Sequence, residues 1–185
     1  MSMRYFRQFA RDESGSEVAE AAIVLPILFL FLFGILWFGR AFNVYTTISD
    51  AAREGSETAA RPTCASCAAA ACVYAGTTFP CDATVETTVL NTLQTANLST
   101  TSIVAYQPAN LLSCVNLTSS PPCDTTASNV TICRSVLMSP AVGNYTPQCG
   151  MLVSFQYTLP VTLPFTTINM QQITLTAEGQ TRMGN

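Results

Sequence analysis

Eight cysteines are the residues whose type and spacing could do chemistry. All of them follow residue 63: Cys64, Cys67, Cys72, Cys81, Cys114, Cys123, Cys133 and Cys149. Cys64 and Cys67 form a Cys-x-x-Cys pair, which occurs in zinc sites and in thioredoxin-like redox motifs. The chain has no His, so zinc would need four cysteines, and no predicted strand precedes the pair as the redox motif requires. Structural disulfides are therefore the favoured interpretation, and a four-cysteine zinc site is the alternative.

Other catalytic chemistry has little support in the sequence. Without His, a Ser or Cys nucleophile lacks its commonest base. The carboxylates beyond residue 62 are too few to argue for an acid–base pair: Asp82, Glu86, Asp124 and Glu178. We predict that the protein is not an enzyme and has no catalytic, cofactor-binding or metal-binding residues.

The charge balance argues against a nucleic-acid partner. The formal net charge is −3, there is no Lys, and the Arg residues are scattered along the chain. Because binding to phosphates needs clustered basic side chains, we predict no nucleic-acid binding.

A long N-terminal helix, predicted over residues 15–61, must carry the cysteine-bearing part. Residues 21–39 have no charge, and at about 1.5 Å of rise each they span roughly 28 Å, close to the hydrocarbon thickness of a bilayer. We therefore predict a membrane anchor. Beyond Arg40, small and apolar residues recur three or four positions apart: Ala41, Val44, Tyr45, Ile48, Ala52, Gly55 and Ala59. This second half is amphipathic, and Pro62 is predicted to end the helix.

The orientation follows from the charges and from the cysteines. Arg4, Arg7 and Arg11 precede the apolar run and favour a cytoplasmic N-terminus, although Arg40, Arg53 and Arg61 on the far side reduce the charge difference. The cysteines all lie on the other side, as expected for an oxidising compartment. We predict a single-pass membrane protein with an extracytoplasmic C-terminal domain.

That domain, residues 62–185, is long enough for one small fold. Asp82 is suited to the N-cap of a helix over residues 82–96. Four strands are predicted at residues 102–106, 130–138, 151–159 and 173–182. Alternating apolar residues in the third strand indicate an antiparallel sheet with one covered side.

The segment between the first two strands, residues 107–129, is rich in Pro, Ser, Thr and Asn and is predicted to be a long surface loop. Among the many pairings that eight cysteines permit, we expect disulfides 114–123 and 133–149, because each closes a short loop beside a predicted strand.

The N-terminal motifs carry a resemblance to a known family. Gly15 lies five residues before Glu20, and Ala-Ile-Val-Leu-Pro, the apolar helix, Phe-Gly-Arg and Ala-Ala-Arg-Glu-Gly follow. These features resemble the N-terminal region of TadE-like proteins, the pseudopilins of the tight-adherence (Flp) pilus system. Residues 153–160 and 173–178 also resemble the family's closing strands, whereas residues 62–148 show no such match.

The resemblance implies a location in a bacterial inner membrane, together with processing and assembly. A prepilin peptidase would cut after Gly15, which makes Ser16 the new N-terminus and Glu20 the fifth residue. The chain would then comprise a leader (1–15), a transmembrane and amphipathic helix (16–61) and an extracytoplasmic domain (62–185). A carboxylate at the edge of a bilayer is costly unless paired, so Glu20 is expected to meet the Ser16 ammonium of a neighbouring subunit. The alternative is an ordinary interfacial Glu.

Together these features predict an α+β protein with a long transmembrane helix and a small, disulfide-bearing, pilin-like domain containing an antiparallel sheet. The predicted function is a minor pilin-like component of a tight-adherence pilus or secretion machine, which assembles by packing the apolar face of residues 21–59 against neighbouring helices. Its partners would be membrane lipid, other pilins and pseudopilins, assembly-platform proteins and the prepilin peptidase. The alternative is a permanently anchored binding or adhesion protein that uses the loop of residues 107–129.

Overall fold

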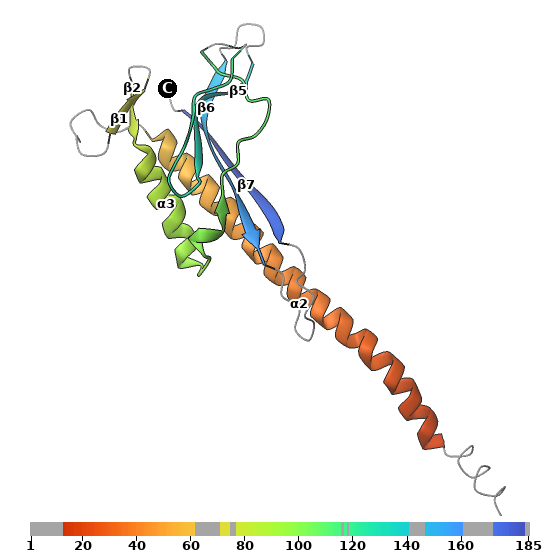
Figure 1. The fold of residues 1–185 in the computed structure, drawn as a ribbon. Coiled ribbons are helices and arrows are strands. Elements are labelled where there is room, and N and C mark those ends of the chain that lie inside the picture. The colour runs from red at the N-terminus through yellow and green to blue at the C-terminus, as the bar shows by residue number, and fades with distance from the viewer. Residues whose placement is uncertain are drawn as a thin grey trace, which may run out of the picture. The chain divides into compact units, whose positions relative to one another are not determined.

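A computed structural model describes residues 13–61, 71–74, 77–115, 117, 119–140, 147–160 and 172–183. The fold is α+β, as predicted: a long N-terminal helix is followed by a curled antiparallel sheet (Figure 1). Its elements are α2 (Glu13–Ala60), β1 (Ala71–Tyr74), β2 (Thr77–Pro80), α3 (Asp82–Thr95), the 3₁₀-helix η1 (Thr100–Ser102), β3 (Ile103–Val104), β4 (Cys123–Thr125), β5 (Thr131–Ser139), β6 (Gln148–Leu159) and β7 (Ile173–Arg182).

Helix α2 agrees with the predicted helix to within two residues at its start and one at its end, and Pro26 lies inside it. The chain divides into two compact units, Met1–Phe42 and Asn43–Asn185, and the point of division lies within α2. The first half of α2 is thus described by itself, and the second half is part of the folded domain.

Strand β6 is the centre of the five-stranded sheet. One of its edges pairs with β7 from Gly150↔Arg182 to Leu159↔Ile173. The other edge is shared by β5 and the short β3, and β4 pairs with β5. Each of the four predicted strands is present, although β3 has only two residues. The hairpin of β1 and β2 and the strand β4 were not predicted.

The second half of α2 packs on the sheet through small residues. Ala51, Ala52, Gly55, Ser56 and Ala59 are buried, together with Val44 and Ile48. A Cβ atom on Gly55 would lie 2.6 Å from Val89 Cγ2 of α3 and 3.4 Å from Val153 Cγ1 of β6. In Figure 1, α3 lies beside this part of α2. Small side chains therefore let the helix approach both α3 and the sheet closely.

The expectation of one covered side is wrong, because both faces of β6 are buried around Leu152 and Val153. Leu152 forms a buried hydrophobic cluster with Cys133 and Val136. Leu111, Cys123 and Met138 pack against this cluster. The covering segment belongs to the predicted surface loop. It follows the edge of β5, where the Leu137 N–H donates to Leu112 O (2.8 Å) and the Cys114 N–H donates to Ser135 O (2.8 Å).

Helix α3 confirms the predicted helix over residues 82–96, but Asp82 is its first helical residue and Cys81 occupies the N-cap. The helix ends in a Schellman motif. Asn97 has a φ of 57°, and the N–H groups of Leu98 and Asn97 donate to Leu93 O and Gln94 O at 2.9 Å each. Asn tolerates this left-handed conformation better than most residues.

Candidate assembly surface

The first half of α2 exposes a continuous apolar surface. Except for Trp37, which is half-buried, its large apolar side chains from Val18 to Phe38 are between 40% and 75% exposed: Val18, Ile23, Val24, Leu25, Ile27, Leu28, Phe29, Leu30, Phe31, Leu32, Phe33, Ile35, Leu36 and Phe38. Among the described residues, α2 is the one helix long and apolar enough to cross a membrane. Its most apolar window has a mean hydropathy of 2.7 and no buried residue. Contact with lipid or with other helices would remove this surface from water.

The apolar face of the second half of α2, by contrast, is buried and is not free to contact lipid or other helices. Val44, Ile48 and Ala52 are buried within their own domain. The expectation that the apolar face of residues 21–59 packs on neighbouring subunits is therefore wrong for its second part. The freely exposed apolar surface ends near the start of the folded domain, where Tyr45 is still 48% exposed.

The predicted processing and assembly residues lie close together on α2. Gly15 and Ser16 belong to its first turn, and Glu20 follows Ser16 by four residues, which places both on one side of the helix. Glu20 is exposed and has no hydrogen-bond or ion-pair partner among the described residues. Its carboxylate is therefore accessible to a group from outside this part of the chain.

The structure pairs the cysteines differently from the expectation. The disulfides are Cys114–Cys149 and Cys123–Cys133, so the predicted pairs 114–123 and 133–149 are wrong. Cys123 and Cys133 lie directly opposite each other in the β4–β5 ladder, with Cα atoms 4.0 Å apart. The sequence analysis missed β4, and with it this pair.

The Cys114–Cys149 disulfide also follows from the pairing of strands. Cys149 lies opposite Leu137 in the β5–β6 ladder, and Leu137 is hydrogen-bonded to Leu112 on its other side. The segment with Cys114 is thereby brought to Cys149, with a Cα–Cα distance of 5.7 Å.

Two further cysteines of the described residues, Cys72 and Cys81, lie in and next to the β1–β2 hairpin. Cys81 is also disulfide-bonded, and Cys72 lies in β1. The four-cysteine zinc alternative involves Cys64 and Cys67, which lie outside the described residues. None of the described cysteines is free, as expected of a domain in an oxidising compartment.

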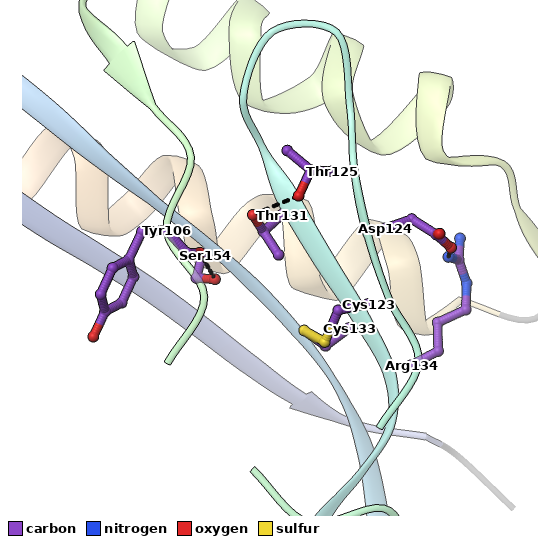
Figure 2. The surroundings of a disulfide bond; sticks show 8 residues. All are labelled: Tyr106, Cys123, Asp124, Thr125, Thr131, Cys133, Arg134 and Ser154. Atoms are coloured by element: carbon purple, nitrogen blue, oxygen red, sulfur yellow. Dashed lines mark hydrogen bonds and ion pairs between the residues drawn. A yellow bond between two sulfur atoms is a disulfide. The ribbon is translucent and has the colours of Figure 1, made fainter. Parts of the chain in front are cut away.

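A buried arginine was missed by the sequence analysis. The side chain of Arg134 in β5 is only 7% exposed and forms ion pairs with Asp82 and, at 3.8 Å, with Asp124 Oδ2. Its Nη2 also donates to Pro80 O at 3.4 Å. Figure 2 shows Arg134 and Asp124 beside the Cys123–Cys133 disulfide. A buried guanidinium needs such partners, so this cluster links β5, β4 and the start of α3, and its role is structural.

Arg134 did leave a signal in the sequence. It is the one Arg between residues 62 and 181, and it lies inside an apolar, strand-like run. A charge in that position indicates either an outward-facing residue or a buried residue with a partner.

These features define a class: an α+β domain on a long N-terminal helix whose first half exposes an apolar surface of membrane-spanning length. Comparison with models of known protein families found a match. A family model described as TadE-like protein matches residues 15–57, and this confirms the TadE-like resemblance over that stretch. No curated protein and no solved structure matches the chain.

Proposed function

We propose that this protein is a non-enzymatic, minor pilin-like component of a tight-adherence (Flp) pilus assembly or secretion machine. The observation that carries the proposal is the extent of the family match. Residues 15–57 begin at the predicted cleavage site and include both the exposed apolar helix and the small residues that attach it to the domain.

The proposed mechanism is assembly through the first half of α2. Before assembly, lipid covers the apolar side chains of this half, and in an assembled machine neighbouring helices take the place of the lipid. Helices in lipid associate by close packing and by polar contacts. The second half keeps the domain attached, because its apolar face is already buried. The other pilins, the platform proteins and the peptidase are the partners that this mechanism requires.

The first prediction concerns processing. The mature protein should lack its first 15 residues and begin at Ser16, because Gly15 has no side chain to obstruct a peptidase and three Arg keep the site cytoplasmic. The intact mass of the protein purified from its native membrane measures this. A chain that stays uncut in a host with the matching peptidase would contradict the pseudopilin proposal.

The second prediction concerns Glu20. The variant Glu20→Gln keeps the shape of the side chain and removes its charge, so it should insert and be processed normally but should crosslink less to partner subunits. The physical reason is that a neighbour's Ser16 ammonium favours a charged carboxylate and pairs with it in only one register of the two helices. Crosslinking in native membranes at equal expression measures the effect.

Glu17→Gln is the matched control, because Glu17 is also an exposed acid of α2 and lies one turn earlier. The control should crosslink as the wild type does. Undiminished crosslinking of the Glu20→Gln variant would instead make Glu20 an ordinary interfacial residue.

A second candidate function has one observation in its favour. The segment held by the Cys114–Cys149 disulfide exposes three apolar side chains: Leu112 (45%), Val115 (77%) and Leu117 (54%). A permanently anchored binding protein could use this fixed apolar tip to recognise a surface or ligand. Such an anchor has no need of processing, so an uncut mature N-terminus would favour this candidate.

A further inference from the structure

The end of the folded domain at which α2 enters it carries exposed apolar side chains. Tyr45 of α2 is 48% exposed and Ile173 at the start of β7 is 46% exposed. We call these two residues the base of the domain. Neither residue has an assigned role in the processing or assembly proposed above.

Helix α2 and strand β7 run in the same direction through the domain. Gly179 lies against the backbone of Ala52, where an added Cβ would be 2.1 Å from Ala52 O. Two residues further along β7, the Thr181 hydroxyl is 2.7 Å from the Ser56 hydroxyl. Figure 1 shows β7 beside this part of α2. The start of β7 therefore points toward the N-terminal end of the helix.

From the contact between Ala52 and Gly179, both residues of the base lie toward the N-terminal end of the helix. Tyr45 precedes Ala52 by seven residues, which is two turns and about 10 Å, so it lies on the same side of α2 as Ala52. Ile173 precedes Gly179 by six residues, or about 20 Å of strand. Ile173 therefore reaches at least as far toward the helix N-terminus as Tyr45 does.

The exposed surface becomes polar on the side of the base that lies farther from the N-terminus of α2. The groove between α2 and β7 is lined by the polar residues Ser49, Asp50, Arg53 and Glu57 of the helix and by residues 178–182 of the strand. On the N-terminal side of Tyr45, the uncharged run of residues 21–39 ends at Gly39, six residues before Tyr45. Such a change from apolar to polar within about three turns marks the boundary between lipid and water.

We propose that the base of the domain rests on the membrane surface, with Tyr45 and Ile173 in contact with lipid headgroups and the first acyl carbons. The proposal rests on the membrane anchoring of α2 and adds a second contact with the bilayer. Tyr is enriched at this depth because its ring is apolar and its hydroxyl is polar. The contact is shallow, because Gln172 and Thr174 beside Ile173 are exposed and polar. A domain held in this way has a fixed orientation to the membrane before assembly.

Tryptophan fluorescence in vesicles tests the contact. Trp37, the single Trp of the chain, is replaced by Phe, and Ile173→Trp or Tyr45→Trp is added to the full-length chain. Each variant is reconstituted into vesicles of phosphatidylethanolamine and phosphatidylglycerol, with or without bromine near the headgroup end of the acyl chains. We expect both new indoles to lose most of their fluorescence in the brominated vesicles.

Two controls separate the outcomes. Val115→Trp, in the segment tied to Cys149 at the opposite end of β6, should keep its fluorescence. Native Trp37 in the unaltered chain reports insertion of α2. Quenching of Trp37 without quenching at positions 45 and 173 would overturn the inference and leave the anchoring intact. Indoles at these positions that are shielded from aqueous acrylamide but not quenched by bromine would show a protein partner instead of lipid, and would also overturn it. An unquenched Trp37 would overturn both the anchoring and the inference.

Discussion

Gly179→Ala should lower the free energy of unfolding of the domain by about 3 kcal/mol, at the upper end for overpacking. The added methyl group would lie 2.1 Å from Ala52 O and 2.3 Å from Ala52 C. These are backbone atoms of α2, so no side-chain rotation relieves the clash, and the helix must move away from β7. Urea unfolding of the full-length chain in detergent, followed by near-ultraviolet circular dichroism, measures the loss.

Gly55→Ala is the matched comparison, because its methyl group would also be too close to a neighbour, at 2.6 Å from Val89 Cγ2. That neighbour is a side-chain methyl group instead of backbone, and Ala gains about 1 kcal/mol over Gly inside a helix, which offsets part of the cost of the close contact. The net change should therefore be about 1 kcal/mol or less. Equal losses for the two variants would contradict the close contact between Gly179 and α2.

Removal of the Cys114–Cys149 disulfide by a double substitution to Ala should cost about 3.8 kcal/mol in the chain-entropy model. This disulfide closes a loop of 35 residues, whereas Cys123–Cys133 closes a loop of 10, for which the same model gives about 2.7 kcal/mol. The loss should appear as a lower urea midpoint in pulse proteolysis. The segment near Leu111 should become sensitive to protease first, because it then keeps only its hydrogen bonds to β5 and the packing of Leu111.

Peptide mapping without reduction checks the pairing on which this estimate depends. In the wild type, one linked pair of peptides should contain Cys114 and Cys149, and a second linked pair should contain Cys123 and Cys133. In the double variant, the first pair should be missing and the second should remain. Peptides that link Cys114 to Cys123 would contradict the structure and restore the pairing expected from the sequence.

The sequence by itself determined the long helix, because its evidence is local. The uncharged run of residues 21–39 and the spacing of three or four residues beyond it need no knowledge of distant contacts. The same holds for α3, with Val85, Val89 and Leu93 on its buried face, and for the apolar, β-branched runs that form β5, β6 and β7. The family resemblance also depends on this local N-terminal pattern.

Only the tertiary structure decided which cysteines pair and which face of each element is covered. Strand β4 has three residues, with no apolar periodicity to reveal it, yet it places Cys123 opposite Cys133. The covering of the second face of β6 likewise depends on hydrogen bonds between Leu112 and Leu137, 25 residues apart in the chain. Such pairings are set by register between strands, which local composition does not encode.

For the candidate assembly surface too, the sequence predicted one part and the tertiary structure decided the other. The sequence placed Gly15, Ser16 and Glu20 at the start of the long helix, because the apolar run that follows them is local evidence. It treated the apolar face of residues 21–59 as one assembly surface. The fold divides that surface, since the small residues from Ala51 to Ala59 pack against α3, β6 and β7. Periodicity shows that a helix has an apolar face, but only the packed neighbours show what covers it.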